Sequence, residues 1–267
     1  MNKIKEPAQE SVQESAQQKI PISVVLISLN EQNNIQRALA SVSWAQDIIV
    51  YDSGSTDQTL DIAKRMGANV IKGQWFGFGK TKKMAIEQAR FDWVLSLDCD
   101  EEVSDSLQIE IRNKINILKP DCVYRIPRLS FYLGRPIKHG GWFPDYQARL
   151  FNKKLHNWNE AMVHEKVEAK NYENLVSCMN HYVFKNIEHQ VQTNNRYSSL
   201  QAEVMFNEGK NFSWFHFFTK PMVKFIECYF LKLGFMDAWP GYIIAYSAGY
   251  SVFLKWAKLR ELETRKL

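Results

Sequence analysis

The sequence predicts an α/β fold, with an open, mostly parallel sheet of the Rossmann kind, helices on both faces and a C-terminal helical extension. From residue 21, short apolar runs rich in β-branched residues alternate with segments whose apolar residues recur at helical spacing. Such alternation is typical of parallel sheets, whose ligands bind at the carboxyl ends of the strands. From residue 208 aromatic residues and lysines become frequent, which indicates a separate helical part.

The expected elements follow in order along the chain. Strands are predicted at residues 22–29, 48–51, 68–72 and 93–97. The helices between them, at residues 30–43, before Gly67 and at residues 80–90, have apolar residues every three or four positions. Later elements are a helix at 104–119, strands at 121–128 and 147–151, and a helix ending near Asn207. The predicted parts of the chain are a disordered polar tail at 1–20, an α/β domain at 21–207 and C-terminal amphipathic helices at 208–267.

Composition is typical of a globular protein in a reducing compartment. Of the 267 residues 45% are apolar, which suffices for a full hydrophobic core. The four cysteines form no CxxC pair, so buried thiols are expected rather than a zinc site. The first 19 residues contain no apolar segment, so no export signal is predicted and a cytoplasmic location is expected.

An acidic stretch ends the fourth predicted strand. Asp98 and Asp100 follow its apolar run and would project from one face of an extended chain, because side chains alternate with a period of two. Two carboxylates so placed suit Mg²⁺ or Mn²⁺, which prefers oxygen ligands and shares its shell with substrate phosphates. The alternative is an acidic turn that caps the helix beginning near Ser104.

Polar residues also end the first two strands. Asn30 and Glu31 follow the first strand, and Asp52 ends the second. Because parallel strands end at one edge of a sheet, these positions indicate a site for a ribose, a base and a metal-bound diphosphate. The turn after the first strand has no glycine, which excludes the G-x-G-x-x-G fingerprint of dinucleotide-binding folds. For any single one of these residues, a helix cap is the alternative.

A glycine-rich loop at residues 73–79 precedes the third predicted helix. Lys80, Lys82 and Lys83 follow it and could meet phosphate at the start of the helix. A flexible surface loop with a solvated basic face fits the same pattern.

Four segments of the chain, in this order, resemble one enzyme family. ISVVLISLNE, IIVYDSGSTDQT, GFGKTKKMA and DWVLSLDCDEE are similar to the family-two inverting glycosyltransferases of the GT-A fold. The likeness covers roughly residues 21–199. Within the family, the chain resembles the lipopolysaccharide inner-core branch of the WaaE or LgtF type, which adds glucose to heptose from UDP-glucose.

The resemblance implies which residues hold the donor, a UDP-sugar. Those expected to bind it are Asn30, Glu31, Asp52, Lys82 and Asp98. The first two match the turn that approaches the ribose, and Asp52 matches the aspartate that faces uracil. Asp98 and Asp100 match the DXD motif, which implies a divalent cation. Lys82 is the phosphate candidate, because its neighbours Thr81 and Lys83 depart from the family pattern.

A long loop at residues 132–145 is the candidate acceptor site. It contains three glycines, two prolines and three basic residues together with Trp142. Aromatic faces beside cations suit a sugar ring that carries phosphate, as an inner-core heptose would. A plain surface loop is the alternative, but loops of this length are uncommon in compact domains unless they have a function.

An inverting transfer needs a carboxylate that takes the proton of the acceptor hydroxyl. The segment AMVHEKVE places His164 and Glu165 where other family members carry a paired acidic motif, which implies that Glu165 is the catalytic base. Asp145 is the second candidate for the base and, with Trp142, a candidate acceptor contact. His164 is expected either to complete the metal shell or to orient Glu165.

The last quarter of the chain indicates contact with a membrane. Residues 208–267 carry nine Lys or Arg against five acidic residues, and Phe225 and Tyr229 belong to an apolar stripe beside the lysines. Basic amphipathic helices of this kind lie on anionic membrane surfaces. Residues 238–254 are uncharged but contain proline and glycines, so an interfacial or packed helix is expected rather than a spanning one. Docking of both helices onto the catalytic domain is the alternative.

Together with this resemblance, which alone implies UDP and glucose, these features predict an inverting glycosyltransferase that moves a hexose in β linkage from a UDP-sugar to a heptose of the lipopolysaccharide inner core. Its expected cofactor is Mg²⁺ or Mn²⁺, and its expected acceptor is a lipid-linked core oligosaccharide at the cytoplasmic surface of the inner membrane. The alternatives are a glycosyltransferase of capsule or another surface polysaccharide and a non-catalytic nucleotide-sugar-binding protein. Nucleic acid is not expected as a partner, because the positive charge accompanies an apolar stripe rather than a broad basic face.

Overall fold

The computed structural model describes residues 18–159 and 165–265, and the chain divides into two compact units. Unit 1 comprises Met1–Pro127 and Tyr146–Asn180, and unit 2 comprises Arg128–Asp145 and His181–Leu267. The division falls within strands that run from one unit into the other. Unit 2 therefore contains the C-terminal helices together with two segments that the sequence grouped with the α/β domain.

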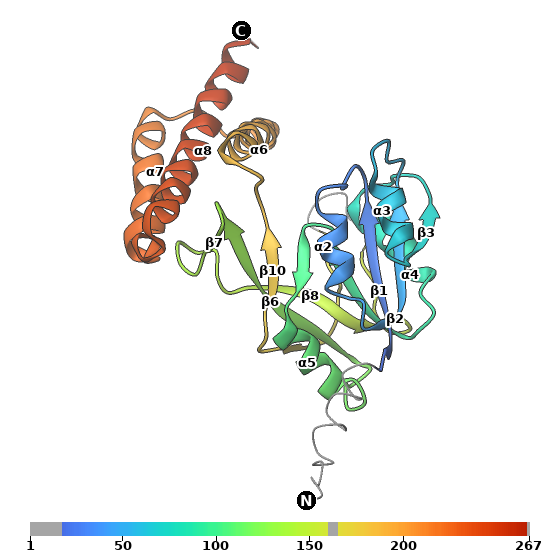
Figure 1. Ribbon diagram of the computed structural model, residues 1–267. Helices are drawn as coiled ribbons and strands as arrows, with labels where there is room; N and C mark the ends of the chain where they lie inside the picture. Colours follow the sequence, from blue (N-terminus) through green and yellow to red (C-terminus); the bar gives the residue numbers. More distant parts are fainter. Residues whose placement is uncertain (1–17, 160–164, 266–267) are drawn as a thin grey trace, which may run out of the picture. The chain divides into compact units, whose positions relative to one another are not determined.

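The strands form a mixed sheet in the order β3-β2-β1-β4-β8-β6-β10-β5, with β7 and β9 paired to β6 (Figure 1). Its parallel part is centred on β1, which pairs with β2 and β4, while β2 also pairs with β3. β8 runs antiparallel to β4. The strands are β1 (Ile20–Ser28), β2 (Ala45–Asp52), β3 (Asn69–Lys72), β4 (Trp93–Asp98), β5 (Glu101–Val103), β6 (Cys122–Tyr132), β7 (Arg135–Pro136), β8 (Asp145–Asn152), β9 (Asn171–Asn174) and β10 (Met179–Tyr182).

Helices cover both faces of the parallel strands. The helices of unit 1 are α2 (Ile35–Ala40), α3 (Thr59–Arg65), α4 (Phe78–Glu87) and α5 (Asp105–Lys114). Apolar side chains of α2, α3 and α5 share one core cluster with Val24 and Leu26, whereas Ala85 and Ile86 of α4 share another with Val25. Successive side chains of a strand point to opposite faces, so β1 is buried on both. This explains its continuous apolar run and confirms the predicted α/β class.

Unit 2 contains three long helices. They are α6 (Ile187–Asn207), α7 (Trp214–Ile226) and α8 (Ala238–Arg265), and two short helical turns, η1 (Glu227–Leu231) and η2 (Gly234–Asp237), connect the last two. Both α6 and α7 pack against α8 (Figure 1). In residues 18–159 and 165–265, no helix combines the length and the apolar composition needed to cross a membrane.

The loop at residues 132–145 is hydrogen-bonded to the turn between α7 and α8, residues 227–237. The Asp237 carboxylate accepts hydrogen bonds from the backbone N–H of His139 at 2.7 Å and of Lys138 at 3.2 Å, and it lies 3.0 Å from His139 Nδ1. The backbone N–H of Gly140 donates to the carbonyl of Lys232 at 2.8 Å. Loop and turn are thus parts of one hydrogen-bonded structure.

Two local differences from the predicted elements have physical causes. The first helix begins at Ile35 rather than residue 30, because Asn30 has a φ of 58°, a left-handed conformation that a helix cannot include. Glu101 and Glu102, for which no strand was predicted, lie in β5. Glu101 is completely buried there, and its charge is balanced by Arg149.

Candidate active site

The register of the sheet brings the predicted strand ends together at one edge of unit 1. Ser28 at the end of β1 is level with Asp52 on β2, and Ile27 is level with Asp98 on β4. Adjacent strands are about 4.8 Å apart, so the backbones of Asp52 and Asp98 lie on either side of β1 and about 10 Å from each other.

Cys99 lies among the acidic residues that follow these strands. Burial raises the pKa of its thiol, and the negative charges of four nearby carboxylates raise the pKa further. These carboxylates belong to Glu31, Asp98, Asp100 and Asp52. Four predicted site residues from three strand ends are therefore within electrostatic reach of one buried sulfur atom.

Asp52 holds the loop that follows β2. The residue is only 1% exposed, and its carboxylate accepts hydrogen bonds from the Ser28 hydroxyl at 2.8 Å, from the Gly54 N–H at 2.9 Å and from both the N–H and the hydroxyl of Ser55. Burial alone would raise the pKa of Asp52, but these hydrogen bonds outweigh it and lower the pKa. The structure thus gives Asp52 a structural role, and its contact with uracil stays a prediction.

Asn30 and Glu31 connect the loop after β1 to the segment that follows β2. The side-chain oxygen of Asn30 accepts a hydrogen bond from the Thr56 N–H at 2.9 Å, and the backbone N–H of Asn30 donates to the Ser55 hydroxyl at 2.8 Å. The N–H of Glu31 donates to the Thr59 hydroxyl at 2.7 Å. The loops after β1 and β2 are therefore fixed to each other, which places the predicted ribose and uracil contacts side by side.

Asp98 is the centre of a buried network of ion pairs. Its Oδ1 lies 2.9 Å from Lys82 Nζ, and its Oδ2 contacts Arg149 Nη2. Arg149 also contacts Glu101 Oε1 at 2.7 Å, while Glu101 Oε2 accepts a hydrogen bond from the Asp98 N–H at 3.0 Å. Burial would raise the pKa of Asp98, but the charges of Arg149 and Lys82 hold this pKa well below its usual range. Asp98 is consequently ionised, and each of its oxygens contacts a cation.

Lys82 connects Asp98 with the predicted base. Its ammonium nitrogen lies 3.5 Å from Glu165 Oε1 and 4.4 Å from the centre of the Trp158 ring. The side chain is 5% exposed, so little of its charge is screened by water. The phosphate-binding candidate of the sequence is therefore a buried cation between a carboxylate of the DXD motif and Glu165.

The site has more carboxylates than positively charged side chains, which suits a divalent cation. Asp98, Glu101 and Glu165 share two cations, and Asp100 adds a further negative charge beside them. Within the described parts of the chain, no three His, Cys, Asp or Glu side chains form a complete metal site. A hard cation needs only one or two carboxylates when substrate phosphates supply its other ligands. Asp98 and Asp100 therefore stay the predicted metal ligands, and the third predicted ligand, His164, lies outside the described residues.

Two residues of this site were not identified from the sequence, Arg149 on β8 and Trp158. Arg149 is 2% exposed, and its guanidinium carbon lies 5.7 Å from the centre of the Trp158 ring. Arg149 Nε and Trp158 Nε1 are buried and have no hydrogen-bond partner among the residues that the structure describes. The sequence did contain a signal for Arg149, which is a charged residue inside the apolar run ARLF. A charge in a buried strand requires a partner of opposite charge, so this position indicated a buried ion pair.

Two further predicted site residues lie in unit 2. Asp145 accepts hydrogen bonds from Arg128 Nε at 2.9 Å and Nη2 at 2.6 Å. The Trp142 ring is half-buried, with its centre 6.1 Å from that of Tyr132 and 6.3 Å from that of Phe184. In unit 2, therefore, Asp145 is ion-paired and Trp142 belongs to an aromatic cluster.

Comparison with known proteins identifies the family. Residues 23–175 match the family model described as glycosyl transferase family 2. An uncharacterized glycosyltransferase of Rickettsia typhi is 34% identical over 258 residues, which cover 91% of this chain and 88% of that protein. The chain belongs to glycosyl transferase family 2. The predicted enzyme class, a glycosyltransferase, is thereby confirmed.

This family 2 glycosyltransferase is also similar to a lipopolysaccharide core biosynthesis glycosyltransferase, LpsC, of Rhizobium meliloti. The two are 24% identical over 262 residues, which cover 93% of this chain and 95% of the relative. Among solved structures, residues 1–349 of S. aureus TarS in complex with UDP-GlcNAc align with a TM-score of 0.46 and 14% identity. That alignment covers 92% of this chain and 91% of the TarS chain.

Proposed function

We propose that the enzyme transfers a hexose from a UDP-sugar to a heptose of the lipopolysaccharide inner core, with inversion at the anomeric carbon. Membership of family 2 supports sugar transfer, and the similarity to LpsC supports an acceptor in the lipopolysaccharide core. The motifs that resemble the WaaE or LgtF type support UDP-glucose as the donor and a β linkage.

The observation that carries the proposal is the array of Asp98, Lys82 and Glu165. One buried ammonium group contacts a carboxylate of the DXD motif at 2.9 Å and the predicted base at 3.5 Å. Inverting transfer requires the groups that bind the donor and the group that takes the proton to be held in a fixed relation. Lys82 supplies that relation, because each carboxylate is oriented toward the same nitrogen atom.

In the proposed reaction, the acceptor hydroxyl attacks the anomeric carbon while the bond from this carbon to the UDP oxygen breaks. Glu165 takes the proton of the hydroxyl, and UDP leaves with the electron pair of the broken bond. Asp98 and Lys82 orient Glu165, and the loops after β1 and β2 bind the nucleoside. A bound Mg²⁺ or Mn²⁺, held by Asp98 and Asp100, would stabilise the charge of the leaving diphosphate.

A screen of nucleotide sugars, with and without Mn²⁺ and with purified core oligosaccharide as acceptor, tests this function. We expect UDP-glucose to be consumed only when the cation and a heptose-containing acceptor are both present. Transfer to a capsule oligosaccharide, but not to the heptose acceptor, would favour the alternative polysaccharide pathway. Binding of UDP-sugars without hydrolysis or transfer to any acceptor would identify a non-catalytic binding protein.

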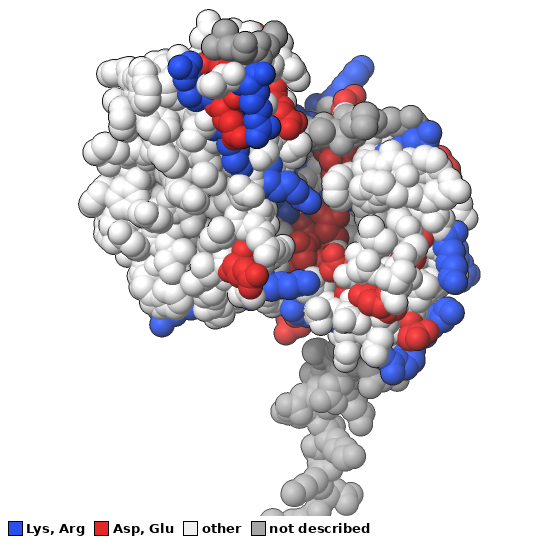
Figure 2. Space-filling model, turned by 90° about the horizontal axis from the view of Figure 1, so that it is seen from above, with Lys and Arg blue, Asp and Glu red and all other residues white. Residues whose placement is uncertain are grey.

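We also propose that unit 2 holds the enzyme at the cytoplasmic surface of the inner membrane, where the acceptor is lipid-linked. Large apolar side chains of α7 and the following turn are exposed, among them Phe215 at 72% and Leu231 at 74%. Figure 2 shows a broad face of unit 2, on the left of the view, that carries almost no charged side chain. Exposed apolar area of this extent is typical of a surface that binds a membrane or another protein.

A further inference from the structure

Trp158 lies against both cations of the buried ion-pair network in unit 1. Its ring centre is 4.4 Å from Lys82 Nζ and 5.7 Å from the guanidinium carbon of Arg149. Both distances are within the ~6 Å at which the negative face of an aromatic ring attracts a cation. Trp158 is 6% exposed, and both cations are buried, so water screens little of this attraction.

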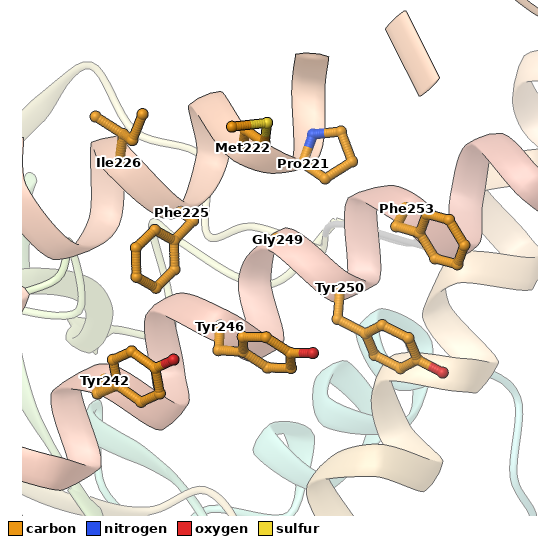
Figure 3. Close-up of a pocket in the computed structure, with 9 residues that line it drawn as sticks. All are labelled: Pro221, Met222, Phe225, Ile226, Tyr242, Tyr246, Gly249, Tyr250 and Phe253. Carbon is orange, nitrogen blue, oxygen red and sulfur yellow. The ribbon is translucent and has the colours of Figure 1, made fainter. Parts of the chain in front are cut away.

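Aromatic rings in a groove of unit 2 provide a contrast. Figure 3 shows this groove, which lies between α7 and α8 and has a volume of about 420 Å³. Its lining residues include no charged side chain, and Phe225 and Tyr242 pack there with ring centres 5.8 Å apart. Packing of this kind stabilises a fold through buried apolar area. Trp158 differs from these rings, because charged groups face it.

The indole N–H of Trp158 indicates that packing is not the only role of this side chain. Trp158 does fill apolar space, in the core cluster that includes Ala85 of α4 and Phe151 of β8. However, its Nε1 is buried and has no hydrogen-bond partner in residues 18–159 and 165–265. A buried donor without a partner destabilises a protein, and an apolar side chain would fill the space without this loss. An indole is explained if the position requires its face, which attracts cations more strongly than the ring of phenylalanine.

The ring completes the surroundings of the Lys82 ammonium group. Among the described residues, Asp98 Oδ1 lies 2.9 Å from the nitrogen, Glu165 Oε1 lies at 3.5 Å, and the ring centre of Trp158 lies at 4.4 Å. Asp98 is the nearer carboxylate, so Coulomb attraction alone would draw the flexible lysine toward Asp98 and away from Glu165. The attraction of the ring depends on neither carboxylate, and it restricts the rotamers that the lysine can adopt.

The backbone of Trp158 is connected to the segment that carries Glu165. Trp158 and Val167 form an isolated antiparallel bridge. Next to this bridge, the Asn159 N–H donates to the carbonyl of Lys166 at 2.9 Å, and the Lys166 N–H donates to Asn159 Oδ1 at 3.0 Å. Trp158 thus contacts both sides of one ion pair: its backbone holds the segment of the carboxylate, and its ring faces the ammonium group.

We propose that Trp158 is a positioning residue for the transfer reaction. Its ring holds the Lys82 ammonium group in contact with Glu165, and this contact orients the carboxylate that takes the proton of the acceptor. The inference rests on the proposed function, because Glu165 is the base only in that reaction. Arg149 does not require the ring, since it is farther from it and is held by two carboxylates.

Steady-state transfer by the full-length enzyme tests this role with two variants. Trp158→Leu keeps apolar bulk but has no aromatic face, whereas Trp158→Phe keeps a face and removes the N–H. We expect Trp158→Leu to lower kcat about 30-fold, the factor that corresponds to the ~2 kcal/mol of a desolvated contact between a cation and a ring. Trp158→Phe should recover most of this loss. UDP affinity, measured by calorimetry, should change little in either variant, because the ring acts on the base rather than on the donor.

Three results would overturn the proposal. Unchanged kcat in Trp158→Leu would make Trp158 a packing residue. An equal loss of kcat in Trp158→Phe would assign the effect to the indole N–H. Weaker UDP binding with unchanged kcat would show that the ring acts on the donor.

Trp44 provides the matched control. It is also 6% exposed, but its indole N–H donates to the carbonyl of Ser41 at 2.8 Å. It directly precedes β2 and so lies at the opposite end of that strand from Asp52. Trp44→Leu should lower Tm, because this hydrogen bond and buried apolar area are lost, but it should leave kcat unchanged. A loss of kcat as large as that of Trp158→Leu would show that kcat follows stability, which contradicts a positioning role.

A double-mutant cycle identifies the cation through which Trp158 acts. Once Lys82→Met has removed the ammonium group, Trp158→Leu should lower kcat no further. In the background of Arg149→Met, Trp158→Leu should lower kcat by the same factor as in the wild type. Coupling to Arg149 alone, or to neither residue, would overturn the assignment to Lys82.

NMR of enzyme labelled with ¹³C-lysine tests the contact without any turnover. The ring current of Trp158 should shift the protons beside the Lys82 ammonium group upfield, and Lys82→Met identifies their resonance by its loss. The shift should persist in Trp158→Phe and vanish in Trp158→Leu. An unshifted resonance in an active enzyme would overturn the contact and leave the proposed function standing. A shifted resonance in an enzyme that transfers no sugar would overturn the proposed function but not the contact.

Discussion

Replacement of Arg149 by methionine is the sharpest test of the buried network. Arg149 contacts Asp98 and Glu101, and Glu101 is completely buried. In Arg149→Met, Lys82 still balances Asp98, but the completely buried Glu101 loses its ion pair with Arg149. Removal of one partner from a buried pair costs about 3–5 kcal/mol, a large share of the ~5–15 kcal/mol that stabilises a typical protein.

Thermal unfolding followed by circular dichroism measures this loss. A change of 1 kcal/mol shifts Tm by roughly 2–4 °C in a protein of this size, so Arg149→Met should melt about 6–20 °C below the wild type. Adding Glu101→Gln should recover part of the loss, because the double variant no longer buries the negative charge that Arg149 balanced. The recovery would identify the buried carboxylate, rather than lost packing, as the cause.

A matched control is the exposed pair Lys154–Asp92, whose side chains are 69% and 46% exposed. Lys154→Met should change stability by less than about 1 kcal/mol, because water screens exposed ion pairs. The reasoning would be refuted if Arg149→Met melted within 2 °C of the wild type, or if Glu101→Gln made the double variant less stable than the single one.

Three further predictions concern the same site. Glu165→Gln should lower transfer roughly 10²–10⁴-fold while calorimetry shows nearly unchanged UDP binding, and wild-type turnover would move the base role to Asp145. Asp100→Ala should abolish Mn²⁺ binding measured by calorimetry in the presence of UDP, and unaltered Mn²⁺ affinity would disprove its role as ligand. Because the pKa of Asp98 in the folded protein lies below its ordinary value of 3.8, the stability from its ion pairs should be full above about pH 4. This stability should be lost as the pH falls further. Arg149→Met, which lacks one of these ion pairs, should therefore show a smaller decrease in Tm between pH 5 and pH 2 than the wild type. An equal decrease would contradict the assignment of this stability to the ion pairs of Asp98.

The strands of unit 1 could be predicted because their sequences are constrained on both faces. Val24 and Val25 point to opposite sides of β1, and both are buried, so the whole run must be apolar. The position of the carboxylates at the strand ends could also be predicted. A charged residue that ends an apolar run lies where the strand leaves the hydrophobic core. β5 escaped prediction because Glu101 is charged, and only a partner distant in sequence, Arg149, makes its burial possible.

The ion-pair network escaped prediction for a related reason. Lys82 appeared as one of several lysines after a glycine loop, and its burial depends on Trp158 and Glu165, which are distant in sequence. Propensity and periodicity describe neighbours along the chain, whereas a buried charge is explained by neighbours in space. The division of the chain shows the same limit, since the loop at residues 132–145 belongs with helices almost a hundred positions later.

The bonds from Asp237 to Lys138 and His139 have a practical consequence for engineering. A chimera that exchanged residues 132–145 alone would leave the carboxylate of Asp237 facing foreign backbone. Donor sequences for such an exchange should therefore be transplanted as a two-part cassette, residues 132–145 together with residues 232–237. Recombination between relatives would preserve these hydrogen bonds only when both parts were inherited together.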